Sequence, residues 1–302
     1  MIQIRVKEDS NDMRLDRFLK ENLNLTHGLI CKYLRSGLIK LNNKKSDFNV
    51  KINQNDVISV VDFVMKNFKH LTANKEKPTD KMIKMISNAI EYEDKDILVL
   101  NKPYGISVQG GDGINFAIID ILTYINSSYK MVHRLDKDTT GVMLFAKNRQ
   151  TSIILSSDFK NRFIKKTYIA ILQGEVREKC GIIKTRIKKV EVRDNESFAR
   201  NCEDGDIAIS EFETLGVSDD KKYSLVKFIP VTGRIHQIRL HALHLGCPVL
   251  GDIKYNSRYQ KNDKLHLVSI DIKLPEDRNF HIKKIPEHIK DFMDKFFSKI
   301  NI

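Results

Sequence analysis

The sequence predicts an α+β protein with a small N-terminal domain and a larger C-terminal domain. Near its start, two segments with helical spacing of apolar residues precede a short hairpin-like stretch. A charged segment interrupted by proline then breaks any regular pattern. Beyond it, short apolar strands alternate with helices to the end of the chain. We therefore place the small domain at residues 13–61, a linker at 62–87 and the large domain at 88–302.

The composition is that of a folded, basic protein. The chain has 302 residues, of which 41% are hydrophobic, enough for a substantial core. It carries 52 Lys and Arg against 39 Asp and Glu, a formal net charge of +13. Such an excess favours a polyanionic partner, nucleic acid above all. Lysine-rich proteomes also contain many basic chains, so charge alone does not decide the partner.

Neither the N-terminus nor the cysteines point to export. The first residues have no apolar core of a signal peptide, and the longest apolar runs are too short to span a membrane. The four cysteines are widely separated and form no Cys-x-x-Cys pair, which argues against a zinc site and against a disulfide framework. We expect a cytoplasmic protein that does not contact membranes.

In the small domain, two predicted helices carry basic outer faces. The first covers residues 13–22, and the second begins after Thr26, a suitable N-cap, and ends at Gly37. Strand-like stretches at 38–42 and 56–60 follow. This pattern resembles the S4 RNA-binding domain, which implies RNA contacts by four outward basic side chains: Arg14, Arg17, Lys32 and Arg35. Any small helical subdomain with a solvated charged face would look similar.

Within the predicted linker, residues 81–86 could form a short helix or become ordered only on contact with RNA. The large domain then opens with an apolar strand at 96–100, which Pro103 ends. A glycine-rich string follows at 105–113, but no Gly-Lys-Ser/Thr completes it, so it is not a phosphate-binding loop. Apolar residues from Ile118 to Ile125 form one stripe of a predicted core helix.

The most chemically dense stretch is HRLDKDTTG at residues 133–141, which runs directly into the apolar strand 142–146. Loops mounted on rigid strands often carry catalytic groups, and Asp136 is our candidate. The alternative is an ordinary turn in which Arg134 pairs with Asp136 at the surface.

This stretch resembles the characteristic motif of the RluA-type pseudouridine synthases. Residues 101–105 resemble the first motif of that family, and the segment GRIHQIR at 233–239 resembles another. The resemblance implies that Asp136 is the nucleophile, that Arg234 forms an ion pair with it, and that Tyr168, which follows Lys166, stacks on the target base.

The same resemblance extends to the surroundings of that site. It implies that Arg134, beside His133 in the substrate-binding loop, helps to hold the RNA open, and that Leu265 walls the site. We expect the catalytic domain to contain a large mixed, mainly antiparallel sheet flanked by helices and loops. Three histidines between 236 and 244 could suggest a metal, but no carboxylate or cysteine completes a ligand set.

The function implied is isomerisation of specific uridines to pseudouridine, which needs no oxidant or group donor, so we expect neither cofactor nor metal. Within that family, the S4-like module, the string QGGxG at 109–113 and the string HRLDxDT at 133–139 resemble members that act on the large ribosomal subunit. This resemblance implies 23S ribosomal RNA, in preference to tRNA, as the substrate. Two other functions stay open, a catalytically silent rRNA-binding or assembly factor and a glycosylase that releases uracil. We expect a monomer.

Overall fold

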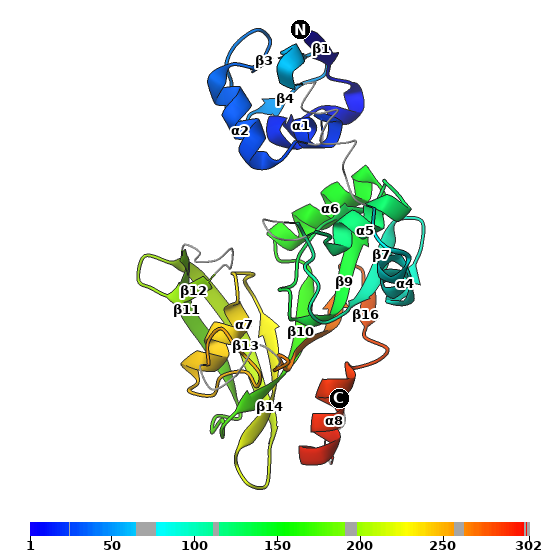
Figure 1. Ribbon diagram of the computed structural model, residues 1–302. Helices are drawn as coiled ribbons and strands as arrows, with labels where there is room; N and C mark the ends of the chain where they lie inside the picture. Colours follow the sequence, from blue (N-terminus) through cyan, green and yellow to red (C-terminus); the bar gives the residue numbers. More distant parts are fainter. Residues whose placement is uncertain are drawn as a thin grey trace. The chain divides into compact units, whose positions relative to one another are not determined.

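The computed structural model describes residues 1–23, 25–64, 77–110, 115–190, 198–256, 263–298 and 300. The chain divides into two compact units, Met1–Lys77 and Pro78–Ile302 (Figure 1). The first unit reaches back to Met1 because its first strand pairs within it. Residues 65–76 of the predicted linker and residues 111–114 of the glycine-rich string lie outside the described residues.

The N-terminal unit packs two helices against small sheets. One sheet has the order β1 (Ile2–Arg5), β5 (Val57–Val60), β3 (Ile39–Leu41), and a second pairs β2 (Met13–Arg14) with β4 (Lys51–Ile52). The helices are α1 (Leu15–Leu23) and α2 (His27–Ser36), and a 3-10 turn covers Glu8–Ser10. Thr26 accepts a hydrogen bond from the Leu29 amide, and Gly37 closes α2 in the left-handed region, as the sequence predicts.

A large mixed sheet forms the second unit. Within the described residues, its strands follow the order β12-β11-β13-β14-β10-β15-β9-β7-β6, with β16 on β15 and β8 on β9. Pairing is antiparallel except between β9 and β15. The expected large, mainly antiparallel mixed sheet is therefore confirmed. The strand bounds are β6 Ile90–Glu93, β7 Ile97–Lys102, β8 Lys130–Met131, β9 Thr140–Ala146, β10 Lys165–Gln173, β11 Cys180–Val190, β12 Phe198–Asn201, β13 Asp206–Val217, β14 Tyr223–Pro230, β15 Leu267–Lys273 and β16 Asn279–His281.

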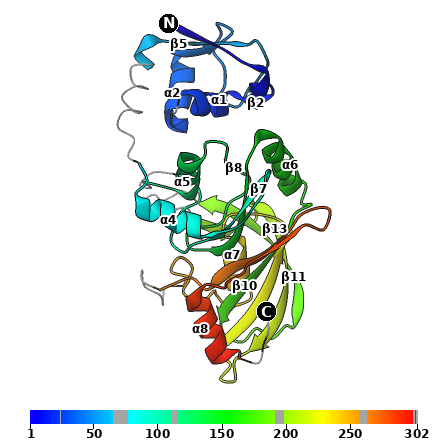
Figure 2. The ribbon, with the colours of Figure 1, turned by 90° about the vertical axis from the view of Figure 1, so that its right-hand side faces the viewer.

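Helices bury both faces of the sheet. Residues of α4 (Asp80–Asn88), α5 (Ile118–Ile125) and α7 (Gln237–His244) join one hydrophobic cluster, and residues of α6 (Arg149–Lys160) and α8 (Glu287–Phe296) join the other. Figure 2 shows α4 and α5 side by side. On β9, Met143 and Phe145 face the first cluster while Val142 and Leu144 face the second. This strand is an unbroken apolar run because both of its faces are buried.

Gly141 is required where β9 lies beside β15. Its φ is +106°, and an added Cβ would stand 2.1 Å from the Ser269 carbonyl oxygen. Only glycine allows this approach. The parallel pairing of β9 and β15 in turn holds the 133–141 loop beside β15.

No helix in the described part of the chain is long and apolar enough to cross a membrane.

Candidate active site

Asp136 lies in the loop between β8 and β9, at a cavity of 720 Å³ in the second unit. Its side chain is 23% exposed. The cavity is walled by the 133–139 loop, by Tyr168 on β10, by Leu267 at the start of β15 and by residues 230–239. A pocket of this size is in the range that takes a nucleotide-sized ligand.

Positive charge dominates the wall of this cavity, and Asp136 is the one carboxylate among its described lining residues. Such a lining favours the phosphates of a nucleic acid and disfavours cationic ligands. The basic side chains that line it are Arg134, Lys160, Arg162, Lys166, Lys189, Arg234 and Arg239.

Arg239 supplies the guanidinium beside Asp136. Its Nη1 lies 3.9 Å from Asp136 Oδ2, while its Nε and Nη2 donate to the two carboxylate oxygens of Asp252 at 2.8 and 2.5 Å. Arg239 and Asp252 are almost fully buried, and the guanidinium also lies 5.0 Å above the centre of the Tyr255 ring. Burial opposes the charge of Arg239, but Asp252 and Asp136 together raise its pKa. Arg239 is therefore a fixed cation at the site.

The family resemblance implies this pairing for Arg234, but in the structure Arg234 lies elsewhere. Arg234 Nη1 lies 3.2 Å from Asp206 Oδ2, and its Nε donates to the Ile207 carbonyl. The expectation assumed a helix starting near Arg234. Instead α7 starts at Gln237, after His236 turns the backbone into the left-handed region at φ 51°. Arg234 therefore stands on the preceding loop at the cavity rim, and Arg239, inside the helix, reaches Asp136.

The environment of Asp136 contains two opposing influences. Burial raises the pKa of its carboxyl, and Arg239, Arg134, Lys254 and Lys102 each lower it, with a net rise above the ordinary value. Burial favours the neutral acid, and nearby cations favour the carboxylate. The ionised form that a nucleophile or base requires thus depends on these four basic groups.

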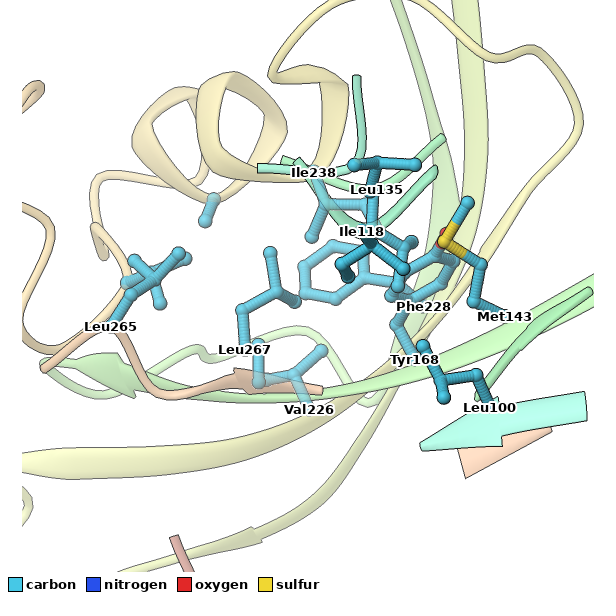
Figure 3. Packing of buried hydrophobic residues seen from close by; sticks show 14 of the residues in the cluster. Leu100, Ile118, Leu135, Met143, Tyr168, Val226, Phe228, Ile238, Leu265 and Leu267 are labelled. Atoms are coloured by element: carbon cyan, nitrogen blue, oxygen red, sulfur yellow. The ribbon is translucent and has the colours of Figure 1, made fainter. Parts of the chain in front are cut away.

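Tyr168 lies next to Asp136 and has its ring in the core. The side chain is 6% exposed and packs among Phe228, Leu267 and Leu135 (Figure 3). Burial, and after it the charge of Asp136, raise the pKa of its hydroxyl. The ring is neutral and lines the cavity, so it can offer an aromatic surface to a base that enters.

The remaining predicted residues of the large domain divide into two groups. Arg134 is exposed and lines the cavity. His133 lines it too, but its ring stacks on Phe159 and its Nε2 accepts the Leu144 amide at 2.9 Å, so it supports the loop. Burial lowers the pKa of His133 to about 3. Leu265 is buried in the core and is not among the residues that line the cavity, where Leu267 stands.

The four predicted RNA contacts of the N-terminal unit are all exposed. Arg14 donates to Asp16 through both Nε and Nη2, and Arg17 donates to Glu21. Lys32 and Arg35 lie on α2, and neither has a carboxylate partner among the described residues. These last two are the more available cations.

Sequence reasoning missed three residues at the site: Arg239, His236 and Lys102. Lys102 is 1% exposed, and its Nζ donates to the carbonyls of Lys137 and Pro103 at 2.6 and 3.0 Å. It thereby ties the end of β7 to the loop that carries Asp136. The motif at 233–239 contained two arginines, and their spacing alone gave no means of choosing between them.

Comparison with known proteins identifies the family of this chain. Residues 96–244 match the RNA pseudouridylate synthase family. The chain is 36% identical over 269 residues to a ribosomal large subunit pseudouridine synthase C of Rickettsia typhi, which covers 85% of this chain and 88% of that protein. The chain belongs to the RNA pseudouridine synthase family. The expectation that it is an enzyme of this class is confirmed.

Other relatives carry the same name at similar coverage. The proteins of Rickettsia bellii and Vibrio cholerae are 38% and 31% identical, over 83% and 84% of this chain. Among solved structures, human RNA pseudouridylate synthase domain containing 4 covers 74% of this chain with a TM-score of 0.59 and 24% identity. That likeness supports the fold, a mixed α+β architecture with a large sheet.

Proposed function

We propose that this pseudouridine synthase isomerises specific uridines of large-subunit, 23S ribosomal RNA, with Asp136 as the catalytic carboxylate. The relatives named above are ribosomal large subunit enzymes, and the net charge of +13 suits an RNA substrate. The single observation that carries the catalytic part is the position of Asp136. It is the lone carboxylate in the described lining of a cationic, nucleotide-sized cavity.

The reaction itself requires little besides positioning and charge. The bond from the base nitrogen N1 to the sugar carbon C1′ breaks, and a bond from base carbon C5 to C1′ forms. N1 gains a proton and C5 loses one, so the reaction is balanced without an oxidant or group donor. Asp136 either attacks C1′ or removes a sugar proton, and both roles need the ionised carboxylate that Arg239 stabilises.

The base must leave its stack to reach the cavity, at a cost of about a few kcal/mol. Stacking on Tyr168 and contacts of Arg134 in the space that the base vacates would offset this cost. Leu267, which lines the cavity, would wall the active site in place of Leu265. Arg234 would then contact the RNA backbone from the rim of the cavity, and His133 would hold the loop in shape.

We further propose that the N-terminal unit is an S4-type RNA-binding module. Its two helices, the caps of α2 and the exposed Lys32 and Arg35 support this assignment. Deletion of residues 1–61 should weaken RNA binding and reduce its salt dependence, because each lost phosphate contact lowers the salt slope. An unchanged slope in filter-binding titrations would count against the module. We expect the protein to be cytoplasmic and monomeric. Sedimentation of the free protein would test the oligomeric state.

The decisive experiment maps pseudouridines in 23S rRNA and tRNA from cells with and without this protein. Carbodiimide-reactive positions that disappear from 23S rRNA alone would support the proposal, whereas loss from tRNA would redirect the substrate. In vitro, Asp136→Asn should bind RNA and make no product. If wild-type protein leaves rRNA unchanged but binds it, the protein is a silent assembly factor, and release of free uracil would identify a glycosylase.

A further inference from the structure

His236 stands beside Asp136 in an unusual backbone conformation. It precedes α7 with φ 51°, a left-handed conformation that costs a non-glycine residue roughly 1–2 kcal/mol. Its side chain is 7% exposed, and Nε2 lies 3.9 Å from Asp136 Oδ2. Strained backbone at a buried position beside a reactive group is a feature of functional sites. The turn that displaces Arg234 from Asp136 thus brings an imidazole toward it.

The hydrogen bonds behind the ring determine which nitrogen carries the proton. The Ala199 backbone amide donates to the Tyr255 hydroxyl at 3.1 Å, and that hydroxyl lies 2.6 Å from His236 Nδ1. Among the described residues, Nδ1 is the acceptor left for the Tyr255 hydrogen. The opposite tautomer would leave the hydrogen of this half-buried hydroxyl without an acceptor among the described residues, which is unfavourable where water has little access. Tyr255 therefore donates to Nδ1, and the ring hydrogen sits on Nε2.

Burial, and after it the surrounding cations, keep the His236 ring neutral. Burial lowers the pKa of His236 to about 3, and Arg239, Lys254 and Arg134 act in the same direction against Asp252. At any pH at which the enzyme would work, the ring is thus an uncharged donor. The direction of its Nε2–H group is set by Tyr255.

We propose that His236 is a positioning residue whose Nε2–H group, oriented by Tyr255, donates to the Asp136 carboxylate when a nucleotide occupies the cavity. The present 3.9 Å is longer than a hydrogen bond, and such bonds often shorten only in the substrate complex. A neutral donor stabilises the carboxylate without adding a charge that would compete with Arg239. This inference rests on the proposed catalytic role of Asp136.

The test compares four variants for tritium release from rRNA transcripts labelled at uridine C5, because that hydrogen leaves when pseudouridine forms. His236→Asn suits the left-handed backbone but lacks a donor at the Nε2 position. His236→Gln offers an amide N–H near that position. Tyr255→Phe keeps the imidazole and removes the hydroxyl that selects its tautomer. Tyr92→Phe, which removes an exposed hydroxyl bonded to Asp94, is the matched control.

The proposed bond forms in the substrate complex, so its loss should raise the pKa of the carboxylate there. The acid limb of the kcat profile, which reports that complex, should therefore move to higher pH in His236→Asn and Tyr255→Phe. Each should lower kcat about tenfold or more. His236→Gln should recover part of both effects, and Tyr92→Phe should match wild type. A lower kcat with an unmoved acid limb in both variants would reduce His236 to a packing role and overturn the inference.

A measurement without RNA separates this inference from the proposed function. Nitrogen-15 NMR of histidine-labelled full-length protein should show one neutral His236 tautomer with hydrogen on Nε2, assigned by its absence in His236→Asn. Tyr255→Phe should convert this signal to a mixture. A hydrogen on Nδ1 in wild type would refute the inference even in a protein that is fully active. If wild type shows the expected tautomer but releases no tritium, the result counts against the proposed function alone.

Discussion

Replacement of Arg239 by methionine tests the central feature of the site. The change removes a guanidinium that is 3% exposed from a carboxylate that is 1% exposed, Asp252. Breaking such a buried pair on one side costs about 3–5 kcal/mol. Asp252 still accepts the backbone amides of Lys254 and Tyr255, so we expect the lower end, about 3 kcal/mol. The pKa of Asp136 should rise further because its nearest guanidinium is gone.

The assay is urea unfolding followed by circular dichroism, combined with tritium release at several pH values. Arg234→Met is the matched control, because its partner Asp206 is 70% exposed and such surface pairs contribute roughly 0–1 kcal/mol. The double variant Arg239→Met with Asp252→Leu should regain most of the stability, since no carboxylate is left unpaired at residue 252, but not the activity. Equal losses of stability for Arg239→Met and Arg234→Met, or retained activity in the double variant, would refute the assignment of Arg239.

Three further changes have expected outcomes. Asp136→Asn should unfold at pH 7 at an equal or higher urea concentration than wild type. The pKa of Asp136 is raised in the folded protein, so its ionised form destabilises the fold above that pKa. A clear loss of stability in Asp136→Asn would contradict this. Burial lowers the pKa of Lys102 to about 7, so between pH 7 and 10 only the unfolded lysine still holds its proton. The stability of wild type relative to Lys102→Met should therefore increase over this pH range. A stability difference independent of pH in urea titrations would argue against a buried amine. Gly141→Ala should cost several kcal/mol of stability or prevent folding, because the added Cβ meets the Ser269 backbone. Gly28→Ala, in α2 with open space around it, should be neutral or slightly stabilising. Equal thermal unfolding midpoints of the two variants would contradict this difference.

Local signals in the sequence were sufficient for many elements of the fold. Thr26 and Gly37 mark the ends of α2 because capping depends on residues within one turn of each other. The apolar run 142–146 is also a local signal and predicts a buried strand, and β9 is found there. The start of α7 was not predictable in this way. Propensity permits a helix from Arg234, but the tertiary structure holds His236 in a left-handed turn, where its ring bonds Tyr255 from a distant segment.

The amino-acid sequence by itself determined the family and the two-part organisation and made Asp136 the catalytic candidate, because these inferences depend on residue type and spacing along the chain. Only the tertiary structure decided which arginine stands beside that carboxylate, that Leu267 rather than Leu265 lines the cavity, and that a buried lysine and a neutral histidine complete the surroundings. The physical reason is that the energy of an interaction between charges depends on their burial and on the distance between them. Arg239 and Asp252 are thirteen residues apart in the chain, and Lys102 and Lys137 thirty-five, so their pairing follows from packing and not from spacing.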